Sequence, residues 1–162
     1  MIGYVCKYTP VEVFEAMGVE ITRIQPEVTN FNQADTLMHP NICSFTKSVL
    51  EDVLAGDYEG VVLTTCCDSI RRLYDVLKQQ CPDKFLYLLD VPRKVNDFST
   101  EMYRKNILDM VHAYEAFSGK TFDETVLKQL LKRREAGQNL RTAPKNKASV
   151  HIGLMGARCS KG

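Results

Sequence analysis

Short apolar runs alternate along the chain with longer segments in which apolar residues recur at helical spacing. The runs that predict strands are residues 2–6, 19–24, 60–65 and 85–89. The last two are continuously apolar, which is typical of strands that are covered on both faces. Strands that alternate with helices predict an α/β fold with a mostly parallel, Rossmann- or flavodoxin-like sheet flanked by helices.

Helical segments are expected to follow each of these strands. The first begins at Thr9-Pro10 and ends at Gly18, and another begins at Pro40-Asn41 and ends at Gly56. Residues 25–41 are polar and irregular, so we expect a long surface loop there. Further helices follow Asp68 and Pro92, and Gly119 ends the second of these. The last helix is expected to bury Val126, Leu127, Leu130 and Leu131.

The pattern divides the chain into three parts. Residues 1–140 are expected to form one α/β domain, and the polar, basic residues 141–148 are interpreted as a linker. Residues 149–162 begin with an apolar run, Val150 to Met155, which is expected to be the first strand of a second domain that the chain lacks.

Composition narrows the range of partners. The chain has 162 residues, of which 44% are hydrophobic and 25% charged, with a formal net charge of +1. This near-neutral balance provides no basic surface for nucleic acid. No apolar stretch approaches the roughly 18 residues of a membrane span, and the first residues lack the pattern of a signal peptide. We therefore expect a cytoplasmic protein that binds neither nucleic acid nor membrane.

Three of the six cysteines stand where the predicted fold would place ligands. Cys66 and Cys67 directly follow a strand, and Cys43 lies just after Asn41, at a predicted helix start. Ligands of such sheets bind outside the carboxyl ends of the strands. The positive end of a helix stabilises a thiolate, the form that binds metal and holds iron–sulfur clusters.

A structural role is the alternative for every cysteine. A cysteine with no disulfide often behaves as a small buried hydrophobe, and this interpretation is favoured for Cys6 and Cys81. For Cys43 and Cys67 the residue chemistry leaves both roles open. A zinc site is less favoured, because no Cys-x-x-Cys pair is present and the three histidines are scattered; His39, four residues before Cys43, is at most an outer neighbour.

Several segments together resemble the 2-hydroxyacyl-CoA dehydratase and benzoyl-CoA reductase family, over nearly the whole chain. These segments are Tyr8-Thr9-Pro10-Val11-Glu12 with Ala16-x-Gly18, Cys43-Ser-Phe-Thr-Lys47, Thr64-Thr-Cys-Cys-Asp68 with Arg71-Arg72-Leu73-Tyr74, and Leu89-Asp-Val-Pro92. The resemblance implies a [4Fe–4S] cluster held by three cysteines, an acyl-CoA substrate, and an ATP-dependent iron–sulfur activator protein that delivers one electron. In the dehydratases, reductive radical elimination of water then converts an (R)-2-hydroxyacyl-CoA to an enoyl-CoA, a lyase reaction.

Carried over to this chain, Cys43 and Cys67 match the first two cluster ligands, and no residue matches the third. Family chains are more than twice as long, so the resemblance implies a truncated chain or a split subunit, inactive alone, that works with a second dehydratase subunit or as a homodimer. Flavin has no support in the sequence. Arg71 and Arg72 are expected to meet cluster charge or CoA phosphates, or to pair with Asp75.

Two alternatives remain open. Many dehydratases of the family have a single cysteine before the aspartate, whereas this chain has two, Cys66 and Cys67, before Asp68. With Cys159, the additional Cys66 would suit the family's double-cubane proteins, which are low-potential reductases or electron-transfer proteins carrying an [8Fe–9S] cluster. Against this, neighbouring residues point in different directions, so only one of Cys66 and Cys67 is expected to face the crevice. The other alternative is a cluster-free α/β interaction domain whose cysteines are structural.

Overall fold

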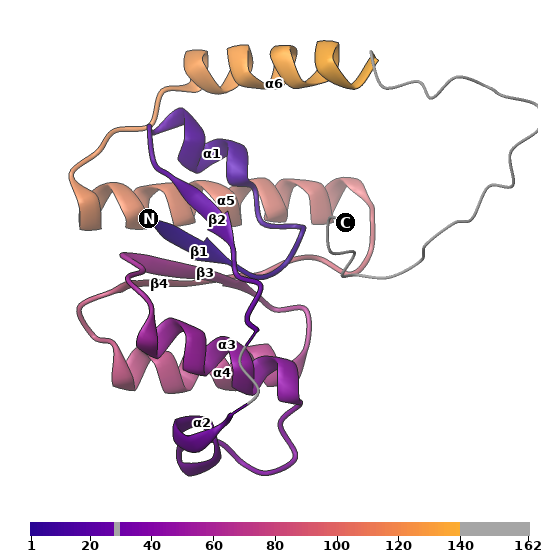
Figure 1. Ribbon diagram of the computed structural model, residues 1–162. Helices are drawn as coiled ribbons and strands as arrows, with labels where there is room; N and C mark the ends of the chain where they lie inside the picture. The colour runs from indigo at the N-terminus through magenta and orange to yellow at the C-terminus, as the bar shows by residue number, and fades with distance from the viewer. Residues whose placement is uncertain (28–29, 140–162) are drawn as a thin grey trace, which may run out of the picture.

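A four-stranded parallel sheet forms the centre of the fold (Figure 1). The structure is a computed structural model and describes residues 1–27 and 30–139. The expected α/β fold with a parallel sheet is confirmed, although the first two strands are shorter than predicted. The predicted linker and second-domain strand, residues 141–162, lie outside the described residues. The strands, in the spatial order β2-β1-β3-β4, are β1 Ile2–Tyr4, β2 Ile21–Arg23, β3 Gly60–Thr64 and β4 Phe85–Leu89.

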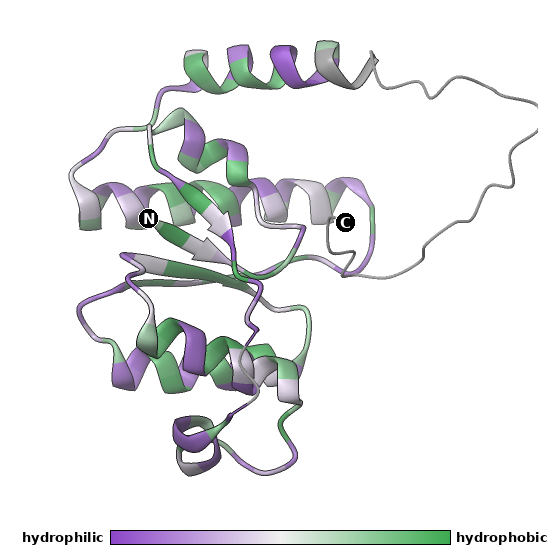
Figure 2. Ribbon diagram, in the orientation of Figure 1, coloured by the Kyte–Doolittle hydropathy of each residue, from purple (hydrophilic) through white to green (hydrophobic). Residues whose placement is uncertain are grey.

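Helices cover both faces of the sheet, with their apolar sides turned toward it (Figures 1 and 2). Helices α3 and α4 lie side by side on one face, and α2 packs outside α3. Helices α1 and α5 lie on the other face, and α6 packs against the outer side of α1. The helices are α1 Val11–Ala16, α2 Asn32–Leu37, α3 Ser44–Ala55, α4 Asp68–Gln80, α5 Asp97–Ser118 and α6 Glu124–Asn139.

Each face of the sheet has its own apolar core. In β3, Val61 and Leu63 pack toward α3 and α4, whereas Val62 packs toward α1 and α5. This alternation follows from the period of two along a strand, and it explains why the run is continuously apolar. Residues on the α5 side of β3, Thr64 included, therefore face a different layer from their immediate neighbours.

None of the described helices has the length and apolar character that crossing a membrane requires. The longest, α5, spans 22 residues and ends at Gly119, as predicted, in a left-handed conformation with φ 71°. Glycine accepts this conformation without the steric cost of a Cβ.

Three details differ from the sequence-based expectation. Helix α3 begins at Ser44 and not at Pro40-Asn41, so Cys43 is its N-cap residue. In the last helix, Val126 and Leu131 are exposed and Leu127 and Leu130 are only half-buried, because α6 is an outer layer that packs mainly on α1. The expected loop of residues 25–41 contains the short helix α2.

Helix α2 owes its place to a distant carboxylate. Glu51, buried in α3, accepts hydrogen bonds from the backbone N–H groups of Gln33 and Ala34 at 2.7 and 2.8 Å. Lys47 also pairs with Asp35 at 2.6 Å. The N-terminal N–H groups of a helix need such acceptors. The segment that leads to Cys43 is thus tied to the helix that follows it.

Replacing Glu51 by Gln is expected to lower the free energy of unfolding by about 1–3 kcal/mol. An amide keeps one acceptor oxygen but loses the charge that strengthens both hydrogen bonds and the interaction with the helix dipole. Urea denaturation measures the change. Glu20→Gln, at an exposed position, is the matched control and should leave stability within about 0.5 kcal/mol. An equal effect of the two substitutions would show that the Glu51 carboxylate does not hold α2.

The order of the strands creates a crevice at one edge of the sheet. The chain passes from β1 outward to β2 and then returns to form β3 on the other side of β1. The connections after β1 and β3 therefore diverge to opposite faces, which opens a crevice outside the carboxyl ends of these two strands. We call this side of the sheet the carboxyl edge.

Candidate functional site

Cys43 and Cys67 are the residues that immediately precede two neighbouring helices. Cys43 is the N-cap of α3 and Cys67 the N-cap of α4. Both helices return the chain to the start of the next strand, so both begin at the carboxyl edge. Since α3 and α4 also contact each other on one face of the sheet, their two N-caps occupy the same corner of the fold (Figure 1). Both residues therefore begin helices at the carboxyl edge, and their joint role as cluster ligands stays a prediction.

The Cys43 side chain is exposed and is held by the first turn of its own helix. Its Sγ lies 3.2 Å from the hydroxyl of Thr46, which is buried. A hydroxyl three residues along can donate to a thiolate, and hydrogen bonds to an ionised acceptor are stronger than neutral ones. Thr46 therefore provides a donor suited to a deprotonated Cys43.

Cys66 differs from its neighbour in environment. Partial burial is the main cause that raises the pKa of the Cys66 thiol, although its side chain, like that of Cys67, is exposed overall. Nearby Cys67 and Cys6 add to the effect, and a hydrogen bond with Thr64 partly opposes it. Cys66 also lines a cavity on the α5 side, whereas Cys67 begins a helix on the opposite face. The two adjacent residues therefore contribute to opposite faces of the sheet.

The alkylation of Cys66 is expected to require more alkaline solution than that of an ordinary thiol. In a Cys67→Ser background, the iodoacetamide reaction at Cys66, followed by peptide mass spectrometry, should have its midpoint above pH 9.0, because burial disfavours the thiolate. The raised pKa also means that Cys66 contributes stability that is lost as pH rises past the ordinary thiol value. A midpoint below pH 8 would show that Cys66 is poised as a thiolate ligand instead.

The remaining cysteines divide between the two edges of the sheet. Cys81 is buried at the C-terminal end of α4, away from the carboxyl edge, as its structural interpretation predicts. Cys6 follows β1 and is half-buried; it lies near enough to Cys66 to raise the pKa of that thiol. No disulfide joins any of the five cysteines within the described part of the chain. Cys159 lies outside the described residues.

The thiols at the carboxyl edge fit two ligands of an iron–sulfur cluster. Both Cys43 and Cys67 are exposed, both stand at positive helix ends, and one has a hydroxyl donor beside its sulfur. Within residues 1–27 and 30–139, no three His, Cys, Asp or Glu side chains are grouped to hold a single metal ion. The described residues by themselves therefore form no complete metal site.

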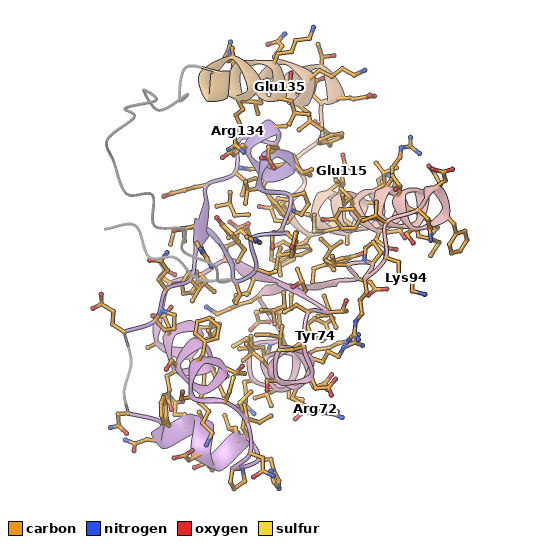
Figure 3. All side chains as sticks on the ribbon, turned by 90° about the vertical axis from the view of Figure 1, so that its right-hand side faces the viewer. Arg72, Tyr74, Lys94, Glu115, Arg134 and Glu135 are labelled. Carbon is orange, nitrogen blue, oxygen red and sulfur yellow. The ribbon has the colours of Figure 1, made fainter. Side chains whose placement is uncertain are left out.

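Of the two arginines in the first turns of α4, Arg72 forms the ion pair with Asp75 that the sequence suggested. Arg72 pairs with Asp75 at 3.5 Å, and both side chains are largely exposed. Figure 3 views the molecule from the side of the carboxyl edge; Arg72 points outward from α4, and Lys94 projects from the segment between β4 and α5. An exposed pair of this kind contributes little to stability.

The cavity beside Cys66 includes residues that sequence reasoning did not select. Tyr103 lies at helical spacing with the apolar residues of α5, and it lines this cavity while its hydroxyl donates to the Tyr8 carbonyl at 2.7 Å. Thr64 and Arg93 also line it. The only signal in the sequence was position, because these residues stand at the ends of the strands β3 and β4.

Comparison with known proteins agrees with these features. The family model described as 2-hydroxyglutaryl-CoA dehydratase, D-component, matches residues 6–148. The chain is 29% identical over 138 residues to the (R)-phenyllactyl-CoA dehydratase beta subunit of Clostridium sporogenes, which covers 80% of this chain and 36% of that protein. It is 25% identical to a benzoyl-CoA reductase subunit of Thauera aromatica, over 82% of this chain and 36% of that protein. The chain thus spans about a third of the length of these curated relatives.

Proposed function

This chain belongs to the 2-hydroxyglutaryl-CoA dehydratase D-component family, and from that membership we propose that it is the cluster-binding part of an acyl-CoA dehydratase or reductase subunit. In this proposal Cys43 and Cys67 are two ligands of a [4Fe–4S] cluster. Further ligands come from outside the described residues. Both relatives are named as subunits, so we propose that the active protein includes a partner subunit and receives electrons from an ATP-dependent iron–sulfur activator.

The observation that carries this proposal is that Cys43 and Cys67 are each the N-cap of a helix that begins at the carboxyl edge. Iron–sulfur clusters are negatively charged when held by thiolates, and two helix N-termini provide partial positive charge where that charge would lie. When bound, such a cluster supplies low-potential one-electron chemistry. Thr46 would donate a hydrogen bond to the Cys43 sulfur, an interaction that tunes thiolate ligands.

We propose an acyl-CoA thioester as the substrate and elimination of water from a 2-hydroxyacyl-CoA as the reaction, because the matching family and one of the two relatives are named for that chemistry. The other relative is named as a reductase of an aromatic acyl-CoA. The part of this chain in that reaction is to bind and orient. The carboxyl edge holds the two thiols, and a cavity lined in part by Cys66 opens at the same edge on the α5 side.

A double-cubane protein of the same family is the second candidate. It is favoured by the proximity of Cys66 to both Cys67 and Cys6, which places three thiols in one region. It is opposed by the position of Cys66 in the wall of a cavity on the α5 side, away from the face on which Cys67 begins a helix. Cys66→Ser separates the candidates, since a [4Fe–4S] protein should keep its iron and a double-cubane protein should lose about half of it.

Anaerobic reconstitution tests the proposed function. The chain is incubated with ferrous iron, sulfide and an excess of a small thiol, which can occupy iron sites that the chain leaves open. We expect a brown protein with iron and sulfide in equal amounts and the visible absorption of a [4Fe–4S] cluster. A folded protein that stays colourless, with iron at the level of a buffer blank, would support the cluster-free interaction domain instead.

A further inference from the structure

The outward side of α5 carries an apolar hollow near the start of the helix. Helix α5 packs on β4 with its inner side, and α6 packs mainly on α1, so the described helices leave this outward side open (Figure 1). Phe98 and Met102, one turn apart, are 75% and 43% exposed. The hollow has a volume of about 210 Å³, and its lining residues are Phe98, Glu101, Met102, Arg104, Lys105 and Leu108.

The shape of this surface suits an aromatic ring from another molecule. An apolar cavity of about 150 Å³ is large enough to bind benzene, so the hollow can hold one phenyl ring. Phe98 borders the hollow but remains largely exposed, and it therefore leaves the space unfilled. An exposed ring beside an open apolar hollow is a pattern that a second copy of the same surface can complete, with each ring entering the other hollow.

The lining residues also have a two-fold pattern about one point of the helix. Taken as pairs that are equally distant from residue 103, they are Phe98 with Leu108, Glu101 with Lys105, and Met102 with Arg104. When two identical helices pack antiparallel about a two-fold axis, positions equally distant from that axis face each other. Phe98 of one copy would then face Leu108 of the other, an apolar pair. Glu101 would face Lys105, a pair of opposite charge.

Charge along α5 favours a second copy over a partner of one sign. Asp97 and Glu101 come first, and Arg104 and Lys105 follow. Parallel packing of two such helices places like charges together, whereas antiparallel packing places opposite charges together. Within the chain, Glu101 pairs with Arg104 at 3.1 Å and Lys105 with Asp109 at 2.8 Å. Exposed pairs of this kind contribute little, so they can exchange for contacts between copies.

We propose that two copies of the chain associate through this surface, with their α5 helices antiparallel and the two-fold axis near residue 103. Each Phe98 ring occupies the hollow of the other copy, beside Leu108. One helix pair buries less than the roughly 1,000 Å² of a stable interface, so the dimer is weak and the chain is monomeric at low micromolar concentration. Cys43 and Cys67 precede helices on the opposite face of the sheet, so the dimer leaves the proposed cluster site uncovered.

Sedimentation velocity of the full chain, from about 5 to about 500 µM, tests this association. We expect a shift from monomer to dimer with no larger species, because a two-fold interface is closed. Phe98→Ala should weaken the association about tenfold or more, since each dimer loses two buried rings. Leu131→Ala is the matched control, because it removes an apolar side chain that is 41% exposed on α6 and should leave the association unchanged.

Two charge reversals test the antiparallel orientation. Glu101→Lys and Lys105→Glu each place like charges opposite one another, and each should weaken the association about threefold to tenfold. The variant that carries both reversals restores opposite charges across the axis and should associate like the wild type. Thermal unfolding of each variant at low concentration shows whether it folds.

A wild-type chain that stays monomeric at about 500 µM would overturn the proposal, and so would a dimer that a folded Phe98→Ala variant retains. If the double reversal associates no better than the single ones, the helices do not pack antiparallel. Iron analysis of the same preparations separates this inference from the proposed function. A chain that binds the cluster but never dimerises contradicts the dimer alone, and a colourless chain that dimerises through Phe98 contradicts the cluster assignment alone.

Discussion

Replacing Cys43 or Cys67 by serine is expected to lower the iron retained after anaerobic reconstitution to about a tenth or less of the wild-type level. A serine hydroxyl stays protonated near neutral pH and is a harder donor than thiolate, so it is a poor ligand for an iron–sulfur cluster. Changes outside the ligand set already cost 10–100-fold in metal affinity, and loss of a ligand is expected to cost at least as much. Iron and sulfide analysis with visible absorption measures the effect.

Cys81→Ala is the matched control for these two substitutions. Cys81 is buried at the far end of α4 and lies away from the carboxyl edge, so its removal changes the thiol count without changing the proposed site. The control should keep its iron. If all three variants lose iron equally, the metal is bound non-specifically through thiols, and the two N-cap cysteines have no special role.

Tyr114→Ala is expected to lower the free energy of unfolding by about 3–5 kcal/mol, the range for loss of a large buried aromatic ring. Tyr114 is fully buried in the core between the sheet and α5. Its ring centroid lies 5.2 Å from that of Phe14 and 4.9 Å from that of Phe85, both in edge-to-face arrangements. Because this side chain joins α1, α5 and β4, its loss leaves a cavity where three elements meet.

Guanidinium denaturation measures this change, and the same helix provides the control. Phe98, near the start of α5, is 75% exposed, so Phe98→Ala should change stability by no more than about 0.5 kcal/mol. Tyr114→Phe removes only the hydroxyl, which donates to Glu59 at 3.1 Å, and should cost about 0.5–1.5 kcal/mol. A loss below 1 kcal/mol for Tyr114→Ala would contradict the packing described here.

The features that depend on local pattern were predictable from the sequence. The apolar run at β4 predicted Phe85–Leu89 with its observed bounds, and Gly119 predicted the end of α5. The position of Cys67 after a strand and before a helix was also predictable, because β3 is a continuous apolar run and α4 has apolar residues at helical spacing. These predictions needed only neighbouring residues.

Features that depend on distant contacts were not predictable. Helix α2 is stabilised by Glu51, which lies 17 positions along the chain from Ala34, so its own sequence reads as a polar loop. The cavity depends on Tyr103 reaching a carbonyl 95 positions away, at Tyr8. Periodicity assigned Tyr103 to the core side of α5 but could not show that the same face also borders a crevice.

The proposed cluster site requires the Cys43 and Cys67 thiols to lie close together, and a thiol cross-link tests this closeness without any metal. Dibromobimane becomes fluorescent when two thiolates displace its two bromides. In a chain whose other four cysteines are changed to serine, we predict rapid fluorescence whose rate does not depend on protein concentration. A chain retaining Cys43 and Cys81 should give none. If both thiols of the first chain are alkylated separately, with no intramolecular cross-link by mass spectrometry, the two cysteines do not form one site.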